Sequence, residues 1–216
     1  MTVDINANFW RQKWQTNNIA FHKSEAHPLL VKHFSQLDRS PGSRVFLPLC
    51  GKTLDIGWLL HCGYRVAGAE LVELAIEQLF AELAIAPQIT PVGNLKRYSA
   101  DRIDIFVGDI FELSAAILGP VDAVYDRAAL VALPEPVRQR YTAHLQTITV
   151  TAPQFLITFQ YDQTLMTGPP FSISAEEVQQ HYGDRYRLSL VDSQDVAGGL
   201  KGNAAEENVW LLRNQP

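Results

Sequence analysis

Residues 44–70 read RVFLPLCGKTLDIGWLLHCGYRVAGAE: a short apolar run, a turn of small residues, a helical segment, and a second apolar run that ends on an acid. A strand–helix–strand unit with glycine in its first turn and a carboxylate about 20 residues further along is typical of sites for adenosine-containing cofactors. The glycine lets the backbone approach the ligand closely, and the carboxylate accepts hydrogen bonds from ribose hydroxyls. This stretch therefore predicts a fold class and a kind of ligand together.

The composition is that of an ordinary globular protein. The chain has 216 residues, of which 47% are hydrophobic, and its 18 basic and 23 acidic residues give a net charge of −5. This length and apolar share favour one domain over residues 1–216. The charges are interspersed, and no basic cluster indicates nucleic acid as a partner.

The sequence contains no pattern typical of a membrane or secreted protein. No apolar run approaches the ~20 residues of a membrane span. The first ten residues, MTVDINANFW, lack the basic region and apolar core of a secretory signal. Two cysteines, Cys50 and Cys62, cannot form a disulfide framework. We therefore expect a soluble cytoplasmic protein without a membrane partner.

Metal-binding and nucleophile motifs are missing from the sequence. There is no HExxH pattern, no second pair of cysteines and no GxSxG turn, so we predict neither a metal site nor a serine nucleophile. The histidines show no clustered spacing with cysteine. They are His22, His27, His33, His61, His144 and His181.

Apolar periodicity predicts strands that alternate with helices. Five strand-then-helix units and a closing pair of strands indicate a mostly parallel sheet with helices on both faces. Right-handed crossovers would place every strand-to-helix loop at one edge, where open α/β sheets bind ligands. The segments between 85 and 103 and from 161 to 173 are expected to be loops. The predicted strands are 45–47, 64–69, 103–107, 121–125, 154–159, 185–191 and 208–213. The predicted helices are 8–15, 28–37, 54–61, 72–85, 111–117, 136–147 and 174–182.

The turn at residues 48–52, PLCGK, matches neither GxGxxG nor GxxxxGK[ST]. Its single glycine suits a ligand that touches the backbone but carries no pyrophosphate, although a plain tight turn is the alternative. Glu70, at the end of the second strand, can accept the 2′- and 3′-hydroxyls of ribose. The alternative for Glu70 is an acid favoured by the dipole of the following helix. The two features together favour a cofactor site.

Two further loops on the same edge carry charged residues. Asp109, after the third strand, can accept from an adenine amino group while the Ile110 amide reaches a ring nitrogen. The alternative is that Asp109 caps the next helix. Arg127, after the fourth strand, can hold a cofactor carboxylate or an electron-rich substrate through its planar fork. Its alternative is a structural ion pair with Asp126.

Five strings of the sequence match a known family. The chain resembles the bacterial thiopurine S-methyltransferases, within the class I S-adenosylmethionine-dependent methyltransferases, over essentially its whole length. PLCGK and DRAALVAL are unusual in order and spacing, which makes the match specific. The strings are FWRQKWQTNNIAFH (9–22), VFLPLCGKTLDIGWL (45–59), VAGAELVELAI (66–76), VYDRAALVALP (124–134) and GPPFSIS (168–174).

The resemblance implies a Rossmann-like, doubly wound sheet of about seven mostly parallel strands, the last of them antiparallel. It also implies that residues 1–40 form a helical cover over the cofactor site, with Phe21 and Phe171 against the substrate. S-adenosylmethionine would bind, and S-adenosylhomocysteine would be the product. The cofactor contacts implied are Trp10, Leu49, Glu70, Asp109, Ile110 and Arg127.

The activity that the resemblance implies is methyl transfer to the sulfur of an aromatic or heterocyclic thiol, with Arg127 acting electrostatically. The alternatives are methylation of selenium or tellurium species in detoxification, and cofactor binding without turnover. An NAD-dependent oxidoreductase is disfavoured because the second and third glycines of its fingerprint are missing. We expect a monomer that acts on a small molecule.

Overall fold

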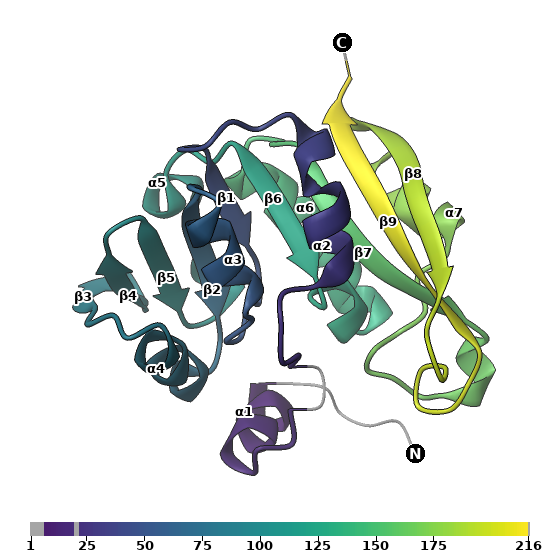
Figure 1. Ribbon diagram of the computed structural model, residues 1–216, viewed down its shortest axis with the longest axis horizontal. Coiled ribbons are helices and arrows are strands. Elements are labelled where there is room, and N and C mark those ends of the chain that lie inside the picture. The colour runs from purple at the N-terminus through teal and green to yellow at the C-terminus, as the bar shows by residue number, and fades with distance from the viewer. Residues whose placement is uncertain (1–6, 20–21, 216) are drawn as a thin grey trace.

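The computed structural model describes residues 7–19 and 22–215, and within them one nine-stranded sheet runs through the molecule in the order β3-β4-β5-β2-β1-β6-β7-β9-β8 (Figure 1). The strands are β1 (Arg44–Leu47), β2 (Arg65–Glu70), β3 (Gln88–Val92), β4 (Leu95–Ala100), β5 (Ile103–Val107), β6 (Ala123–Arg127), β7 (Gln154–Tyr161), β8 (Tyr186–Asp195) and β9 (Ala205–Asn214). The α-helices are α1 (Ala7–Gln15), α2 (Pro28–His33), α3 (Asp55–His61), α4 (Glu73–Glu82), α5 (Ala115–Leu118), α6 (Glu135–Ile148) and α7 (Ala175–Tyr182). The 3-10 helices are η1 (Phe34–Leu37), η2 (Ile110–Glu112), η3 (Leu130–Ala132) and η4 (Gln163–Leu165).

The centre of the sheet is parallel. Strand β1 pairs with β2 and β6, β2 pairs with β5, and β6 pairs with β7, all in parallel. Strand β9 is antiparallel to both β7 and β8, between which it lies. The seven strands from β5 to β8 therefore confirm the predicted sheet, including its antiparallel last strand.

The expected loop before residue 103 is wrong, because the structure has an antiparallel hairpin there. Strands β3 and β4 pair with each other, and β4 pairs with β5, which extends the sheet by two strands. The apolar alternation is weak because Leu95 and Tyr98 are the fully buried residues of the two strands. Pro91 lies on the outer strand, where a missing N–H is tolerated. Gly93, with φ +58°, supplies the turn.

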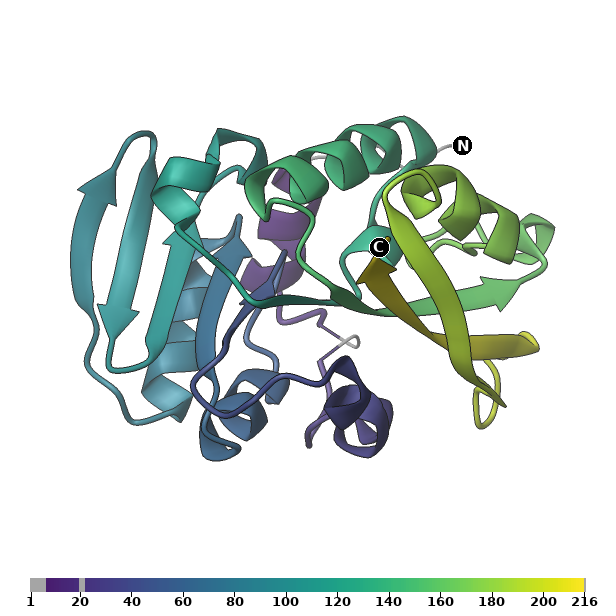
Figure 2. The same cartoon turned by 90° about the horizontal axis from the view of Figure 1, so that it is seen from above.

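Alternating side chains divide the core into two layers, one on each face of the sheet. On β1, Val45 and Leu47 belong to the layer that contains residues of α2, α3 and α4. Phe46 belongs to the opposite layer, with residues of α5, α6 and α7. Figure 2 shows these two groups of helices on either side of the sheet. The period of two along a strand thus produces a three-layer α/β/α fold.

Side-chain caps mark the starts of α5 and α7. Ser174 caps α7, since its Oγ accepts from the Glu177 amide at 3.2 Å. The predicted helix 111–117 is instead two short helices, η2 and α5. Ser114 lies between them, and its Oγ accepts from the Ile117 amide at 3.2 Å, which starts a new helix.

No helix in the described ranges, 7–19 and 22–215, has the length and apolar character needed to span a membrane.

Candidate functional site

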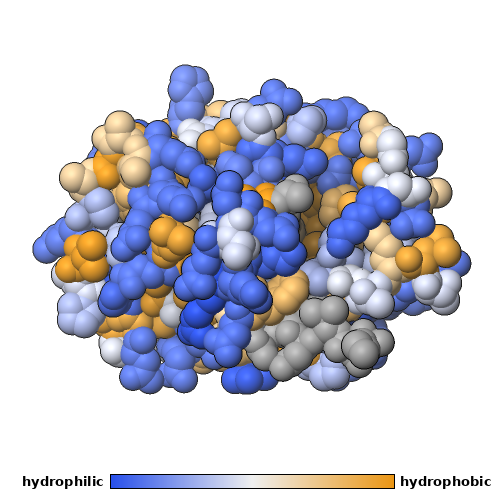
Figure 3. Space-filling model, turned by 90° about the horizontal axis from the view of Figure 1, so that it is seen from below, coloured by the Kyte–Doolittle hydropathy of each residue, from blue (hydrophilic) through white to orange (hydrophobic). Residues whose placement is uncertain are grey.

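The carboxyl ends of the parallel strands meet at one edge of the sheet, and α1 lies beyond that edge (Figure 1). Figure 3 looks onto this side of the molecule, where hydrophilic residues dominate the middle of the face. The turn after β1, the end of β2 and the loop after β5 all open here. Open α/β sheets bind ligands at this edge.

Glu70 connects the end of β2 to the turn that follows β1. Its Oε2 accepts from the Gly51 amide at 2.8 Å, and its Oε1 accepts from the Val72 amide at 2.8 Å. The side chain is buried, with 7% of the residue exposed. Leu49 and Gly51 both have positive φ, +48° and +52°, which bends the turn toward the carboxylate. The sequence placed these residues on one edge, and the structure brings them into direct contact.

Two opposing effects act on the Glu70 carboxylate. Burial raises the pKa of Glu70, and the amides of Val72, Gly51 and Leu71 oppose that rise. A carboxylate offers about four lone-pair positions, so these backbone donors leave room for at least one further donor, such as a ribose hydroxyl. The residues present therefore fit the ribose of a nucleoside.

Helix α1 packs on this turn through Trp14, a residue to which the sequence assigns no role. Trp14 is buried and forms a small apolar cluster with Val72 and Ala75, against which Trp10 also packs. A Cβ on Gly51 would lie 3.0 Å from the Trp14 ring. The spacing of the two tryptophans at i and i+4 signals one shared face. It does not say which surface that face covers.

We expect Gly51→Ala to release α1 from the turn. Alanine at positive φ costs about 1–2 kcal/mol by itself, and the new methyl would also press on the Trp14 ring. Gly93→Ala is the matched control, because Gly93 has a similar φ of +58° with its nearest neighbour, an Ile117 methyl, at 3.5 Å. Hydrogen exchange of residues 7–15 should speed up in the first variant alone. Equal protection of α1 in both variants would contradict this contact.

A cavity of about 410 Å³ lies between α1 and the start of α4. Its walls come from α1, from the residues that follow Glu70, from the β3–β4 turn and from the end of β5. This position, next to both the second and the third loop of the edge, suits the base of a nucleoside whose ribose is at Glu70. Its lining includes Arg11, Gln15, Leu71, Leu74, Asn94 and Val107.

Asp109 and Ile110 lie in the loop after β5, on the expected edge. Asp109 is exposed and caps η2, since its Oδ1 accepts from the Phe111 amide at 3.0 Å. Ile110 is buried, and its carbonyl is within 2.8 Å of His144 Nε2. The cap that sequence reasoning gave as the alternative is therefore present, and the adenine contact stays a prediction.

Asp126 and Arg127 are adjacent on β6 and point to opposite faces of the sheet. Asp126 is fully buried, and its oxygens accept from the Tyr141 hydroxyl at 2.7 Å and the Leu130 amide at 3.1 Å. No ion pair between Asp126 and Arg127 occurs in the described structure. The strand's alternation separates them, so the structural-pair alternative for Arg127 is wrong.

Asp126 should make stability depend on pH. Burial raises the pKa of Asp126 from 3.8 to about 6. The folded protein therefore binds more protons than the unfolded chain between about pH 4 and 6, and this contribution is lost as pH rises through the folded pKa. Relative to Asp126→Asn, wild type should lose up to about 3 kcal/mol of unfolding free energy from pH 4 to 7. Urea unfolding across this range measures the difference, and a pH-independent difference would contradict it.

Arg127 is half-buried on the face that also holds Tyr125 and the segment after residue 21. The Tyr125 hydroxyl donates to Asp55 Oδ2 at 2.9 Å, and the His27 amide donates to Asp55 Oδ1 at 2.7 Å. Burial is the main cause that lowers the pKa of His22; the charges of Lys52 and Arg127 lower it further, and those of Glu82 and Asp55 oppose them. Asp55 and His22 are thus near neighbours of Arg127, and no local sequence pattern indicates this proximity.

The two expected substrate residues have different outcomes. Phe21 lies outside the described residues. The Phe171 ring lies 5.5 Å from the Arg138 guanidinium, and a Cβ on Gly168 would be 2.6 Å from that ring. The loop that carries Phe171 is tied to η3, because the Phe171 amide donates to the Val131 carbonyl at 2.6 Å. These contacts fix Phe171 against α6, and its contact with a substrate stays a prediction.

The helical segment of residues 1–40 divides between two places. Helix α1 lies at the edge with the turn and Glu70, whereas Leu29, Leu30 and Phe34 of α2 and η1 pack into the core beside α3. In the described ranges, no group of three His, Cys, Asp or Glu side chains is arranged to hold a metal ion.

Known proteins match the chain at the level of family and of fold. The family model described as Thiopurine S-methyltransferase (TPMT) matches residues 5–215. The thiopurine S-methyltransferase of Xanthobacter autotrophicus is 56% identical, over 94% of this chain and 97% of the relative. The thiopurine S-methyltransferase of Teredinibacter turnerae is 51% identical, over 96% of this chain and 97% of the relative.

Among solved structures, the chain is similar to a 1,6-didemethyltoxoflavin-N1-methyltransferase of Burkholderia thailandensis that holds S-adenosylhomocysteine. The TM-score is 0.67 at 16% identity, and the match covers 98% of this chain and 88% of that protein. At this identity the likeness concerns the fold, a mixed sheet with a parallel centre and antiparallel strands at its C-terminal side.

Proposed function

Because this chain belongs to the thiopurine S-methyltransferase family, we propose that it transfers a methyl group from S-adenosylmethionine to the sulfur of an aromatic or heterocyclic thiol. The observation that carries the proposal is the buried Glu70 carboxylate, which joins the turn after β1 to the start of α4. It lies beside a cavity of about 410 Å³ at the ligand-binding edge of the sheet. The protein would act as a single-domain cytoplasmic monomer on a small molecule.

Six residues are proposed to hold the cofactor. Glu70 would accept the ribose hydroxyls, Asp109 and the Ile110 amide would meet the adenine, and Leu49 would pass its backbone beside the ligand. Trp10 would cover the site from α1, together with the N-terminal segment. Arg127 completes the set and faces the acceptor side of the edge.

The proposed chemistry needs few groups from the protein. Bound S-adenosylmethionine supplies a methyl group on a positively charged sulfur, which a thiolate can take. Opposite charges disappear in such a transfer, so surroundings that exclude water favour it over the separated, hydrated ions. Trp10, Phe21 and Phe171 would supply that apolar environment, and Glu70 and Arg127 would fix the alignment of the two reactants.

A strong general base is not required. An aromatic thiol is more acidic than cysteine, whose pKa is ~8.5. The Arg127 guanidinium would favour the thiolate by its charge. An acceptor that is already largely ionised would then need no proton-abstracting side chain.

Incubation with methyl-labelled S-adenosylmethionine and a panel of acceptors tests the proposal. Thiopurines and arylthiols should give labelled thioethers, identified by mass spectrometry, whereas the matching phenols and hydroxypurines should not. Labelled products from selenite or tellurite alone would favour the detoxification alternative. Binding of the cofactor by calorimetry with no labelled product from any acceptor would leave a non-catalytic binding protein and refute the proposed transfer.

A further inference from the structure

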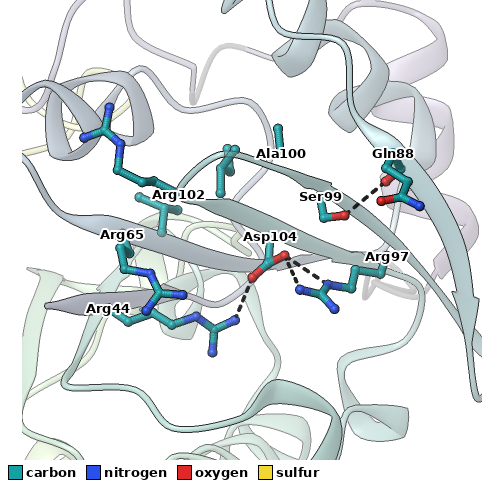
Figure 4. Close-up of a pocket in the computed structure, with 10 residues that line it drawn as sticks. Arg44, Arg65, Gln88, Arg97, Ser99, Ala100, Arg102 and Asp104 are labelled. Carbon is teal, nitrogen blue, oxygen red and sulfur yellow. Dashed lines mark hydrogen bonds and ion pairs between the residues drawn. The ribbon is translucent and has the colours of Figure 1, made fainter. Parts of the chain in front are cut away.

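A second cavity, of about 330 Å³, lies at the opposite edge of the sheet, where the parallel strands begin (Figure 4). The first residues of β1 and β2, Arg44 and Arg65, contribute to it, together with Arg97 of β4 and Asp104 of β5. Arg44 and Arg65 are far in the sequence from each other and from the β4–β5 pair that carries Arg97 and Asp104. The order β4-β5-β2-β1 brings them together.

Two guanidinium groups pair with one carboxylate in this cavity, and a third, that of Arg65, lies near Arg44. Asp104 Oδ1 accepts from Arg97 Nε at 2.9 Å and from Arg97 Nη2 at 2.6 Å. Asp104 Oδ2 accepts from Arg44 Nη2 at 3.2 Å. Two further hydrogen bonds fix the position of the Arg44 guanidinium, since its Nη1 donates to the carbonyls of Leu118 and Pro120. Figure 4 shows Asp104 between Arg44 and Arg97.

Arg65 completes the group without a partner of its own. Among the described residues, its guanidinium makes no hydrogen bond or ion pair with another side chain. It is close enough to Arg44 for its charge to lower the pKa of that residue, after the larger effect of burial. The Arg44 side chain is 11% exposed. A guanidinium that is largely removed from water is stabilised by each nearby anion, and here one carboxylate is shared between two guanidinium groups.

The other charges around the cavity do not remove this excess. Arg102 lines the cavity as well, but its Nη1 donates to the Leu60 carbonyl at 3.0 Å and its Nε lies 3.6 Å from Asp101, which is 94% exposed. Asp122 accepts from the backbone amide of Arg44 at 2.6 Å. Within the cavity itself, three converging positive charges therefore face the single negative charge of Asp104.

We propose that this cavity binds a doubly charged phosphate group, either as inorganic phosphate or as a phosphate monoester. Three guanidinium groups less one carboxylate leave two positive charges, which matches the dianion that a phosphate monoester forms above its second pKa of about 6. The planar forks of arginine suit phosphate oxygens, and Ser99 and Gln88 add polar groups on the cavity wall.

The site is distinct from the proposed methyl-transfer site. Strand β2 runs from Arg65 in the cavity to Glu70 at the opposite edge. At about 3.3 Å per residue, these two positions are roughly 17 Å apart. Phosphate bound at the arginines therefore does not compete with a nucleoside at Glu70.

Isothermal titration calorimetry at constant ionic strength tests the proposal. The titrants are inorganic phosphate and glycerol 3-phosphate, with glycerol as the uncharged control. Arg65→Gln removes the unpaired charge and leaves every other contact of the cavity in place. Arg185→Gln is the matched control, because Arg185 is an exposed arginine at the start of the distant strand β8. Asp104→Asn removes the competing negative charge.

Wild type and Arg185→Gln should bind one phosphate group per chain at millimolar concentrations or below, and glycerol should not bind. Arg65→Gln should weaken the affinity about tenfold, and Asp104→Asn should strengthen it about threefold. Binding of inorganic phosphate alone would identify the free ion, and binding of both titrants the ester. An affinity unchanged in Arg65→Gln, or no saturation by about 20 mM, would overturn the proposal.

Discussion

Glu70→Ala is expected to weaken S-adenosylmethionine binding by at least about 30-fold. The reason is the proposed loss of two charge-assisted hydrogen bonds to the ribose, worth about 2 kcal/mol or more together. The substitution also leaves the amides of Gly51 and Val72 without the acceptor that they have in the folded protein. Calorimetric titration of the folded variant with the cofactor measures the effect.

Two further variants separate binding from folding. Glu77→Ala makes the same change on the exposed side of α4 and should leave cofactor affinity at the wild-type value. Glu70→Gln keeps the side-chain shape but leaves one acceptor oxygen for the amides of Gly51 and Val72, so circular dichroism should first show that it is folded, and the folded variant should lose most of the affinity. Wild-type affinity in folded Glu70→Ala would remove the central support of the proposed function.

Arg127→Ala is expected to lower kcat/KM for an arylthiol by roughly 10- to 150-fold, the range for one lost hydrogen bond to a charged group. Without the guanidinium, the pKa of the bound thiol rises toward its value in water. The ascending limb of the kcat profile, which reports groups in the enzyme–substrate complex, should therefore move to higher pH. Steady-state rates with saturating cofactor across pH 5–9 measure this shift.

The same variant distinguishes the two roles open to Arg127. If the guanidinium holds a cofactor carboxylate, the Kd for S-adenosylmethionine should rise and the pH profile should stay in place. Arg127→Lys keeps the charge and should restore the pH profile in part, because it lacks only the planar fork. Arg187→Ala, at an exposed position of β8, is the control. A wild-type profile and a wild-type Kd in Arg127→Ala would exclude both roles.

The order of the central elements was predictable because it depends on local patterns. Short buried runs of β-branched and aromatic residues indicated β1, β2, β5, β6, β7 and the closing pair. Caps such as Ser174 fixed where helices begin. The hairpin of β3 and β4 escaped prediction because its outer face is polar and its apolar alternation is therefore short.

Side-chain partners were much less predictable than side-chain positions. The sequence placed Glu70, Asp109 and Arg127 at one edge of the sheet. It did not indicate that Asp126 turns away to Tyr141, or that Phe171 packs on Arg138. Such contacts join residues that are many positions apart, and no local pattern encodes them.

The sequence by itself determined the strand–helix alternation, the carboxyl edge with its turn, and the acid at position 70, since each follows from short-range periodicity and from the chemistry of glycine and carboxylate. Tertiary structure alone decided that Trp14 lies on Gly51, that Arg44 and Arg97 both bind Asp104, and that Arg65 lies near Arg44. The physical reason is the order of strands in the sheet. Packing of two apolar layers selects that order, and it brings together residues that the chain keeps apart.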